Sequence, residues 1–392
     1  MAHKLLDVET LSRIPYVEPY YGFQISPDGR ALSFSSNPTG QWEIYQVPIE
    51  GASLPKQITR GPGAKFNPRC SPDGRQLTCT LDLTGGEAFD ILLLDLSTGE
   101  QTNLTPDTPD AIQPCYAWSP DAAQIAFLSD RSGCFHTYIL PLSGGPARLV
   151  LDLPYADWDV HWAPDGHHLA VVSQTEGQDH GVFIVPVDGG DVCAISDGGS
   201  RVPALTPSWA PDGGRVAFAS NTHGVYDLGI YDLATGQTTW VTEGEGEKEM
   251  PAWSPCGTRL VYVVSHGPTS NLVVLDLESG QQATYRVDEG VHYLPRFTPD
   301  GRFVAFLFDN PQHPTNLHLL SLDDGMIRPL TESLPAGLET DDFAMPEQVR
   351  YPSLDGQQVP ALLYRPAASE EPPPAVIYAH GGPNWLTQIT WD

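Results

Sequence analysis

Two adjacent glycines near the end of the chain have the type and spacing needed to stabilise a negatively charged oxygen. The run His380-Gly381-Gly382-Pro383 directly follows residues 375–379, a continuous apolar stretch. Such a stretch is typical of a strand buried on both faces. Glycines let backbone N–H groups approach a developing negative charge without a Cβ in the way. The segment is therefore a candidate oxyanion loop, and a chance glycine turn is the alternative.

The other groups that acyl transfer needs are absent from the sequence. A serine nucleophile of this kind is expected in a G-x-S-x-G motif after the loop, and the chain contains no such motif. No histidine follows His380. We therefore expect the nucleophile, the acid and the base to lie outside these 392 residues, and the chain alone to be inactive.

A four-residue turn recurs seven times, in steps of 44 to 48 residues. The copies are SPDG at Ser26, SPDG at Ser71, SPDA at Ser119, APDG at Ala163, APDG at Ala210, SPCG at Ser254 and TPDG at Thr298. Ser, Pro, Asp and Gly suit the four positions of a type I turn. A repeat of this length with strand patterning is typical of the blades of a β-propeller.

Each repeat contains four short segments with strand patterning. One large or apolar side chain precedes every turn and is expected to pack between neighbouring blades; these are Ile25, Cys70, Trp118, Trp162, Trp209, Trp253 and Phe297. Second, third and fourth strands follow the turn, as in residues 215–220, 228–237 and 238–242. We predict a mainly β fold, a seven-bladed β-propeller of four-stranded blades over residues 18–335, after an N-terminal extension of residues 1–17.

The sequence changes character after residue 335. Residues 347–367 are patterned as a hairpin with Asp355-Gly356 at its turn, and a proline-rich linker leads into the apolar run at 375–379. Strands of the propeller are half-buried, whereas this run suits a fully buried strand. Residues 336–392 are therefore predicted to be the incomplete N-terminal part of an α/β domain.

The P-x-W-[SA]-P-D-G turn resembles the propeller repeat shared by TolB-like proteins and serine peptidases of the prolyl oligopeptidase family. WD-repeat propellers are a poorer match. The hairpin and His380-Gly381-Gly382-Pro383 also resemble the start of the α/β-hydrolase domain of these peptidases, acylaminoacyl-peptidases above all. The resemblance implies that Gly381 or Gly382 is a backbone oxyanion donor. It also implies that His380 orients the loop and is not the base of the triad.

The resemblance implies a function as well. In this family the propeller covers the active site and admits only short or unstructured peptides. The chain would then be the front portion of a longer serine peptidase, truncated before its nucleophile. The alternative is a TolB-like propeller that binds a protein or peptide partner without catalysis. Neither reading requires a cofactor or a metal, and a homo-oligomer is compatible with both.

Charge and cysteine content restrict the partners and the compartment. Forty-nine acidic against twenty basic residues give a formal charge of −29, which would repel a nucleic-acid backbone. Six cysteines without a CxxC pair are expected to be reduced thiols in a cytoplasmic protein. Neither a signal-peptide pattern nor a run of eighteen apolar residues occurs, so no membrane association is expected.

Three other segments contain residues that could form a site. Residues 157–168 group three aspartates with three histidines, but strand alternation should scatter them, so a metal site is not expected. Residues 243–249 form an acidic stretch that we interpret as a solvated loop, with capture of a substrate amino terminus as the alternative. His266-Gly267-Pro268 resembles the later motif superficially and is predicted to be a simple turn.

Overall fold

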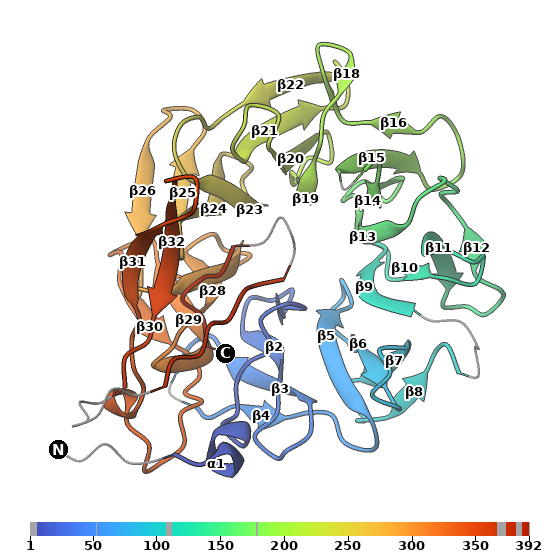
Figure 1. Cartoon of the computed structure of the whole chain (residues 1–392). Helices are drawn as coiled ribbons and strands as arrows, with labels where there is room; N and C mark the ends of the chain where they lie inside the picture. The colour runs from blue at the N-terminus through green and yellow to red at the C-terminus, as the bar shows by residue number, and fades with distance from the viewer. Residues whose placement is uncertain are drawn as a thin grey trace.

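Seven antiparallel sheets of four strands each are arranged around a common axis (Figure 1). The computed structural model describes residues 6–51, 53–106, 112–177, 179–366, 374–381 and 386–391, and the sheets are counted within these ranges. Every sheet uses four strands in chain order, with the first strand nearest the axis and the fourth at the rim (Figure 1). The predicted mainly β fold, a seven-bladed propeller, is therefore confirmed.

The first four blades have the following strands. Blade 1 contains β1 (Phe23–Ile25), β2 (Ala31–Ser36), β3 (Glu43–Pro48) and β4 (Lys56–Gln57). Blade 2 contains β5 (Ala64–Cys70), β6 (Gln76–Asp82), β7 (Phe89–Asp95) and β8 (Gln101–Asn103). Blade 3 contains β9 (Ile112–Trp118), β10 (Gln124–Ser129), β11 (His136–Pro141) and β12 (Arg148–Leu149). Blade 4 contains β13 (Asp157–Trp162), β14 (His168–Gln174), β15 (His180–Pro186) and β16 (Cys193–Ala194).

Three further blades complete the ring. Blade 5 contains β19 (Leu205–Trp209), β20 (Arg215–Ser220), β21 (Asp227–Asp232) and β22 (Gln237–Trp240). Blade 6 contains β23 (Glu247–Trp253), β24 (Arg259–His266), β25 (Thr269–Asp276) and β26 (Gln282–Tyr285). Blade 7 contains β27 (Val291–Phe297), β28 (Phe303–Asn310), β29 (His313–Ser321) and β30 (Ile327–Pro329).

A few short elements lie outside the blades. They are helix α1 (Val8–Ser12), the hairpin of β17 (Ser196–Asp197) and β18 (Ser200–Arg201), the 3-10 helix η1 (Thr340–Asp342), and the hairpin of β31 (Glu347–Pro352) and β32 (Gln358–Leu363). Asp7 begins α1, because its carboxylate accepts the Thr10 N–H at 2.7 Å. No helix in the described part of the chain is long and apolar enough to cross a membrane.

The recurrent turn is held by hydrogen bonds within its own residues. In blade 1 the Gly29 N–H donates to the Ser26 carbonyl at 2.8 Å, and the Ser26 hydroxyl donates to the Asp28 carboxylate at 2.6 Å. Gly29 has a φ of +70°, which glycine adopts without a steric penalty. Ala122 occupies the same place in blade 3 with a φ of +59°, at a cost of about 1–2 kcal/mol. Each turn connects the first two strands of its blade.

The tryptophans before the turns lie between blades, as expected. The Trp253 indole N–H donates to the carbonyl of Ser208 in blade 5 at 3.0 Å. Trp118 and Trp253 are each 8% exposed, whereas Trp162 and Trp209 are half-buried. The predicted packing of these tryptophans between blades is therefore confirmed. Two of the four, Trp118 and Trp253, are buried.

An extended segment before β1 closes the ring. The Val17 N–H donates to the carbonyl of Thr315 in blade 7 at 2.9 Å, and the Glu18 N–H donates to the carbonyl of Ser35 in blade 1 at 3.0 Å. Val17 is buried in a cluster that draws its other members from these two blades. The two ends of the propeller are thus joined by side-chain packing and these bonds, while each blade keeps four strands of its own.

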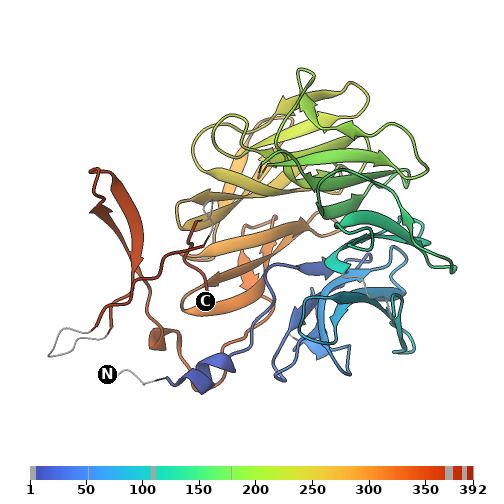
Figure 2. The same ribbon diagram turned by 45° about the vertical axis from the view of Figure 1, so that its right-hand side comes forward.

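The chain after the blades only partly follows the prediction. The hairpin β31–β32 forms with Asp355-Gly356 at its turn, and it stands away from the blades (Figure 2). Residues 375–379 form no strand, and Val376 and Ile377 are each 93% exposed. The predicted strand is therefore wrong here, because a buried parallel strand requires neighbouring strands and covering helices. The described residues contain no α/β-hydrolase sheet.

Candidate functional site

The proposed oxyanion loop is exposed where the structure describes it. His380 Nδ1 lies 2.6 Å from the carbonyl oxygen of Gly381 in a segment without regular structure. A Cβ built at Gly381 would meet no atom of the described residues within 4 Å, so this glycine has open space around it. Gly382 and Pro383 lie outside the described residues. The donor role of Gly381 and Gly382 and the orienting role of His380 therefore stay predictions.

The chain returns to the propeller after this loop. Ile389 is fully buried, and its N–H donates to the carbonyl of Pro268 in blade 6 at 2.9 Å. The Trp391 ring packs edge-on against Phe343 with ring centroids 5.0 Å apart. Residues 389–391 thus occupy the surface at blades 6 and 7.

A buried carboxylate lies beneath this contact. Asp309 of β28 is 2% exposed and accepts hydrogen bonds from the Thr315 hydroxyl at 2.7 Å and the Tyr293 hydroxyl at 3.2 Å. The Trp391 N–H reaches the same carboxylate at 3.4 Å. Burial raises the pKa of Asp309 to about 7, although these donors act in the opposite direction. The neutral acid is therefore favoured in the folded protein more than in the unfolded chain.

We expect the Asp309 carboxyl to make stability fall as pH rises. Its folded pKa of about 7 lies above its ordinary value, so the unfolded chain loses this proton first. The loss of unfolding free energy caused by Asp309 should begin near pH 4, grow until about pH 7 and reach about 4 kcal/mol. Denaturant unfolding between pH 4 and 8 should therefore show a flatter profile for Asp309→Asn than for the natural chain. Parallel profiles would contradict this expectation.

The inner strands place one residue of every blade at an equivalent position. This residue precedes the large side chain before the turn, and in each blade it pairs with the residue nine positions later. The seven residues are Gln24, Arg69, Ala117, His161, Ser208, Ala252 and Arg296. We call this set the inner ring. Three members, Ala117, Ser208 and Ala252, are small, and two, Arg69 and Arg296, carry a guanidinium group.

A backbone irregularity precedes both arginines of the inner ring. Asn67 and Leu294 have left-handed φ values of 50°, and each is followed by a proline and then by the arginine. The strand register shifts at both places, between Phe66 and Arg69 and at the equivalent step in β27. The same left-handed residue and register shift precede Ser208 in blade 5 and Ala252 in blade 6, so the bulge is a general feature of the inner strands and not a mark of the arginines.

Arg69 and Arg296 hold equivalent positions on the inner strands of blades 2 and 7, which lie on either side of blade 1 (Figure 1). Burial, followed by the positive charge of Arg69, lowers the pKa of Arg296 to about 10, while Asp159 acts in the opposite direction. Arg69 Nη1 and Arg296 Nε are both buried, and neither has a hydrogen-bond partner within the described residues. The site therefore contains two like charges and unused donors.

Asp159 of blade 4 is the acidic group of this site. Its carboxylate lies 2.9 Å from His161 Nε2 and accepts the Val160 N–H at 2.8 Å. Burial opposes ionisation, but His161, the Val160 N–H and Arg69 together hold the pKa of Asp159 below its ordinary value. Asp159 is therefore ionised, and it already has its own partners. Together Arg69, Arg296, Asp159 and His161 form what we call the axial cluster.

Sequence reasoning missed both arginines of the axial cluster. A signal was present, because a Pro-Arg pair stands two residues before the turn in blades 2 and 7. Its meaning depends on blades that are far apart in sequence, so local patterning could not reveal it.

The other sequence candidates do not form a site. In residues 157–168, Asp159 contacts His161 and Asp165 contacts His168 at 2.7 Å, while Asp157 bonds elsewhere. No three His, Cys, Asp or Glu side chains converge on a metal position in the part that the structure describes. His266-Gly267-Pro268 is a turn between β24 and β25, as predicted.

The acidic stretch at residues 243–249 is not wholly a loop. Glu247 and Glu249 belong to β23, the inner strand of blade 6. Burial, followed by the charge of Glu247, raises the pKa of Glu249. Lys248, between them, forms an ion pair with Asp227 at 2.9 Å. The interpretation as a solvated loop was therefore wrong for these residues, because they complete a blade.

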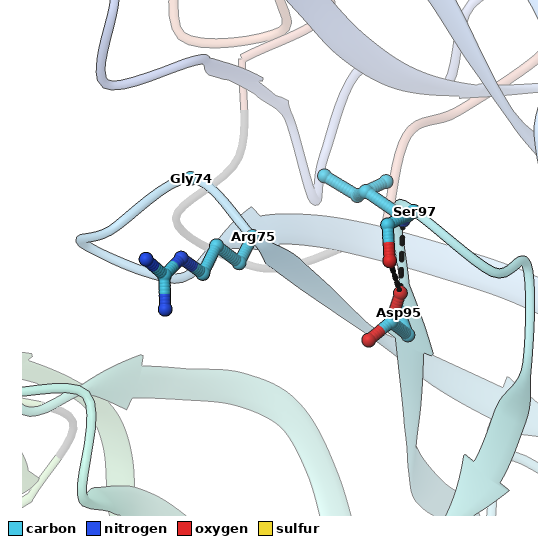
Figure 3. Close-up of a pocket in the computed structure, with 5 residues that line it drawn as sticks. Gly74, Arg75, Asp95 and Ser97 are labelled. Atoms are coloured by element: carbon cyan, nitrogen blue, oxygen red, sulfur yellow. Dashed lines mark hydrogen bonds between the residues drawn. The ribbon is translucent and has the colours of Figure 1, made fainter.

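A shallow surface pocket on blade 2 also fails as a site. Gly74, Arg75 and residues 95–97 line it (Figure 3). The Ser97 hydroxyl and N–H donate to the Asp95 carboxylate at 2.6 and 2.8 Å, and the Arg75 side chain points away from that carboxylate (Figure 3). The polar groups of Asp95 and Ser97 therefore bond to each other and stabilise the turn that contains them.

The fold and the repeated turn define the class, a seven-bladed propeller with consecutive strands in each blade. A family model described as the TolB beta propeller domain, PD40, matches residues 16–200 and 177–336. The chain therefore belongs to the PD40 family of TolB β-propeller domains.

Curated relatives match only part of the chain. An uncharacterised protein of Agrobacterium fabrum is 30% identical over 209 residues, 50% of this chain and 67% of that protein. The uncharacterised peptidase YuxL of Bacillus subtilis is 32% identical over 118 residues, 29% of this chain and 18% of the peptidase. The Tol-Pal system protein TolB of Francisella tularensis is 28% identical over 213 residues, 53% of this chain and 47% of TolB.

Similar solved structures include peptidases. A puromycin-hydrolysing peptidase of Mycobacterium tuberculosis has a TM-score of 0.79 at 18% identity, over 98% of this chain and 64% of the peptidase. A puromycin hydrolase has a TM-score of 0.74 at 18% identity, over 96% of this chain and 67% of the hydrolase. These identities show a shared fold alone. The chain spans about two thirds of the length of either enzyme.

Proposed function

We propose that this propeller is the substrate-admitting part of a serine peptidase of the prolyl oligopeptidase family that hydrolyses short peptides. The chief support is the extent of the structural likeness. It covers 98% of this chain, although the last blade strand ends at Pro329, so the match continues beyond the propeller. The hairpin β31–β32 and the run from His380 lie in that continuation.

The chemistry would be acyl transfer through a serine that this sequence does not contain. Backbone donors at Gly381 and Gly382 would stabilise a charge that develops only after a nucleophile attacks a carbonyl. One such donor contributes about 3–4 kcal/mol to transition-state stabilisation in related serine enzymes. Without the nucleophile and its base, no negative charge develops for the loop to stabilise.

The test compares two proteins. Residues 1–392 alone should neither hydrolyse acyl-peptides nor react with a fluorophosphonate probe, because the nucleophile and base are missing. The product of the complete gene should do both, on one serine. Stoichiometric labelling of the 392-residue chain would contradict the proposal, since it would require a complete site within the blades.

The second candidate function is a propeller that binds a protein or peptide without catalysis. The match to the TolB beta propeller domain and the similarity to TolB of Francisella tularensis favour it. A complete gene product that neither labels nor hydrolyses, but still binds peptides, would select this function.

A further inference from the structure

The two arginines of the axial cluster stand out in an acidic protein. The chain carries 20 basic and 49 acidic residues, yet Arg69 and Arg296 hold equivalent positions on the inner strands of blades 2 and 7, and each has a buried nitrogen without an acceptor in the described residues. Two like charges in a partly buried site repel each other and destabilise the fold unless an anion lies between them. A purely structural role would call for apolar or paired side chains here.

The unused donors indicate the chemistry of the missing partner. A guanidinium is always charged, and its planar N–H groups match the paired oxygens of a carboxylate or phosphate. Arg69 Nη1 and Arg296 Nε lack acceptors within the residues that the structure covers. Buried donors without acceptors are unfavourable, and an oxyanion would supply acceptors to both.

Asp159 offsets only part of this positive charge. Its carboxylate is engaged by His161 and by the Val160 N–H, at 2.9 and 2.8 Å. Two guanidinium groups against one carboxylate leave an excess of positive charge. Ala117, Ser208 and Ala252 hold the equivalent positions in three other blades, and their side chains carry no charge that would balance the arginines.

We propose that Arg69 and Arg296 form an oxyanion-binding site at the propeller axis, and that its ligand is the carboxylate of a peptide. The assignment to a peptide rests on the proposed function, because a propeller that admits peptides meets their free carboxylates. The oxyanion site itself does not rest on it. Inorganic phosphate offers the same chemistry from another source.

Calorimetric titration of the 392-residue chain in a buffer free of chloride and phosphate tests this proposal. The probes are acetyl-trialanine as the free acid, its C-terminal amide, and inorganic phosphate. The free acid should bind at least tenfold more tightly than the amide, since charged hydrogen bonds are lost in the amide. Arg69→Gln and Arg296→Gln should each weaken binding at least tenfold. Arg75→Gln, on an exposed turn of blade 2, should leave it unchanged.

Other outcomes are equally informative. Phosphate binding that both substitutions weaken, with acid and amide indistinguishable, would support the oxyanion site and overturn the peptide assignment. Absence of binding by both anions, or binding that neither substitution changes, would overturn the site. A complete gene product without peptidase activity would leave these binding results standing, so the two proposals fail separately.

Melting temperatures separate a ligand site from a structural one. Without anions, Arg296→Gln should melt at or above the temperature of the natural chain, because it removes a repulsion. Added phosphate should raise the melting temperature of the natural chain and of Arg75→Gln, but not that of Arg296→Gln. Equal stabilisation of all three by phosphate would overturn the proposal.

Discussion

Replacing Lys65 by methionine is expected to lower the free energy of unfolding by about 3–5 kcal/mol. The Lys65 ammonium lies 3.0 Å from the Glu43 carboxylate, and the two side chains are 1% and 4% exposed. It also donates to the carbonyls of Gly61 and Gly63 at 2.8 and 3.0 Å. Methionine fills a similar volume but leaves the Glu43 charge buried, with the Thr59 hydroxyl, at 2.6 Å, as its remaining partner among the described residues.

Two controls make this measurement specific. Lys56→Met changes an exposed lysine in the neighbouring blade 1 and should alter stability by less than about 0.5 kcal/mol. Lys248→Met breaks the equivalent pair with Asp227, which links blades 5 and 6 at 2.9 Å, and should resemble Lys65→Met. Denaturant unfolding of the three variants gives the comparison. Equal stability of the Lys65 and Lys56 variants would show that the buried pair is not required.

The fold was predictable because its signal is local and repeated. Each Pro-Asp-Gly turn specifies its own backbone geometry, and the spacing between turns leaves room for four short strands. The buried ion pair of Lys65 and Glu43 was not predictable in this way. It joins the inner strand of blade 2 to the third strand of blade 1, so it depends on how blades meet.

The candidate site was less accessible to sequence reasoning. Residues 375–379 have the composition of a buried strand, but strand formation depends on partners that composition does not specify. Arg69 and Arg296 are separated by most of the propeller in sequence, and only closure of the ring places their inner strands on either side of blade 1. Motifs in a continuous stretch were therefore found, whereas the axial cluster was not.

Replacing Trp253 by alanine is expected to cost about 3–5 kcal/mol of stability, because it opens a cavity between blades 5 and 6. The ring is 8% exposed, its N–H donates to the Ser208 carbonyl at 3.0 Å, and the Arg215 guanidinium lies 4.8 Å from the ring centroid. The matched control is Trp158→Ala, since Trp158 is 57% exposed and its loss should change stability by less than about 0.5 kcal/mol. Thermal and denaturant unfolding should separate the two variants. If the Trp253 variant proved as stable as the control, packing at the turn could not be what holds neighbouring blades together.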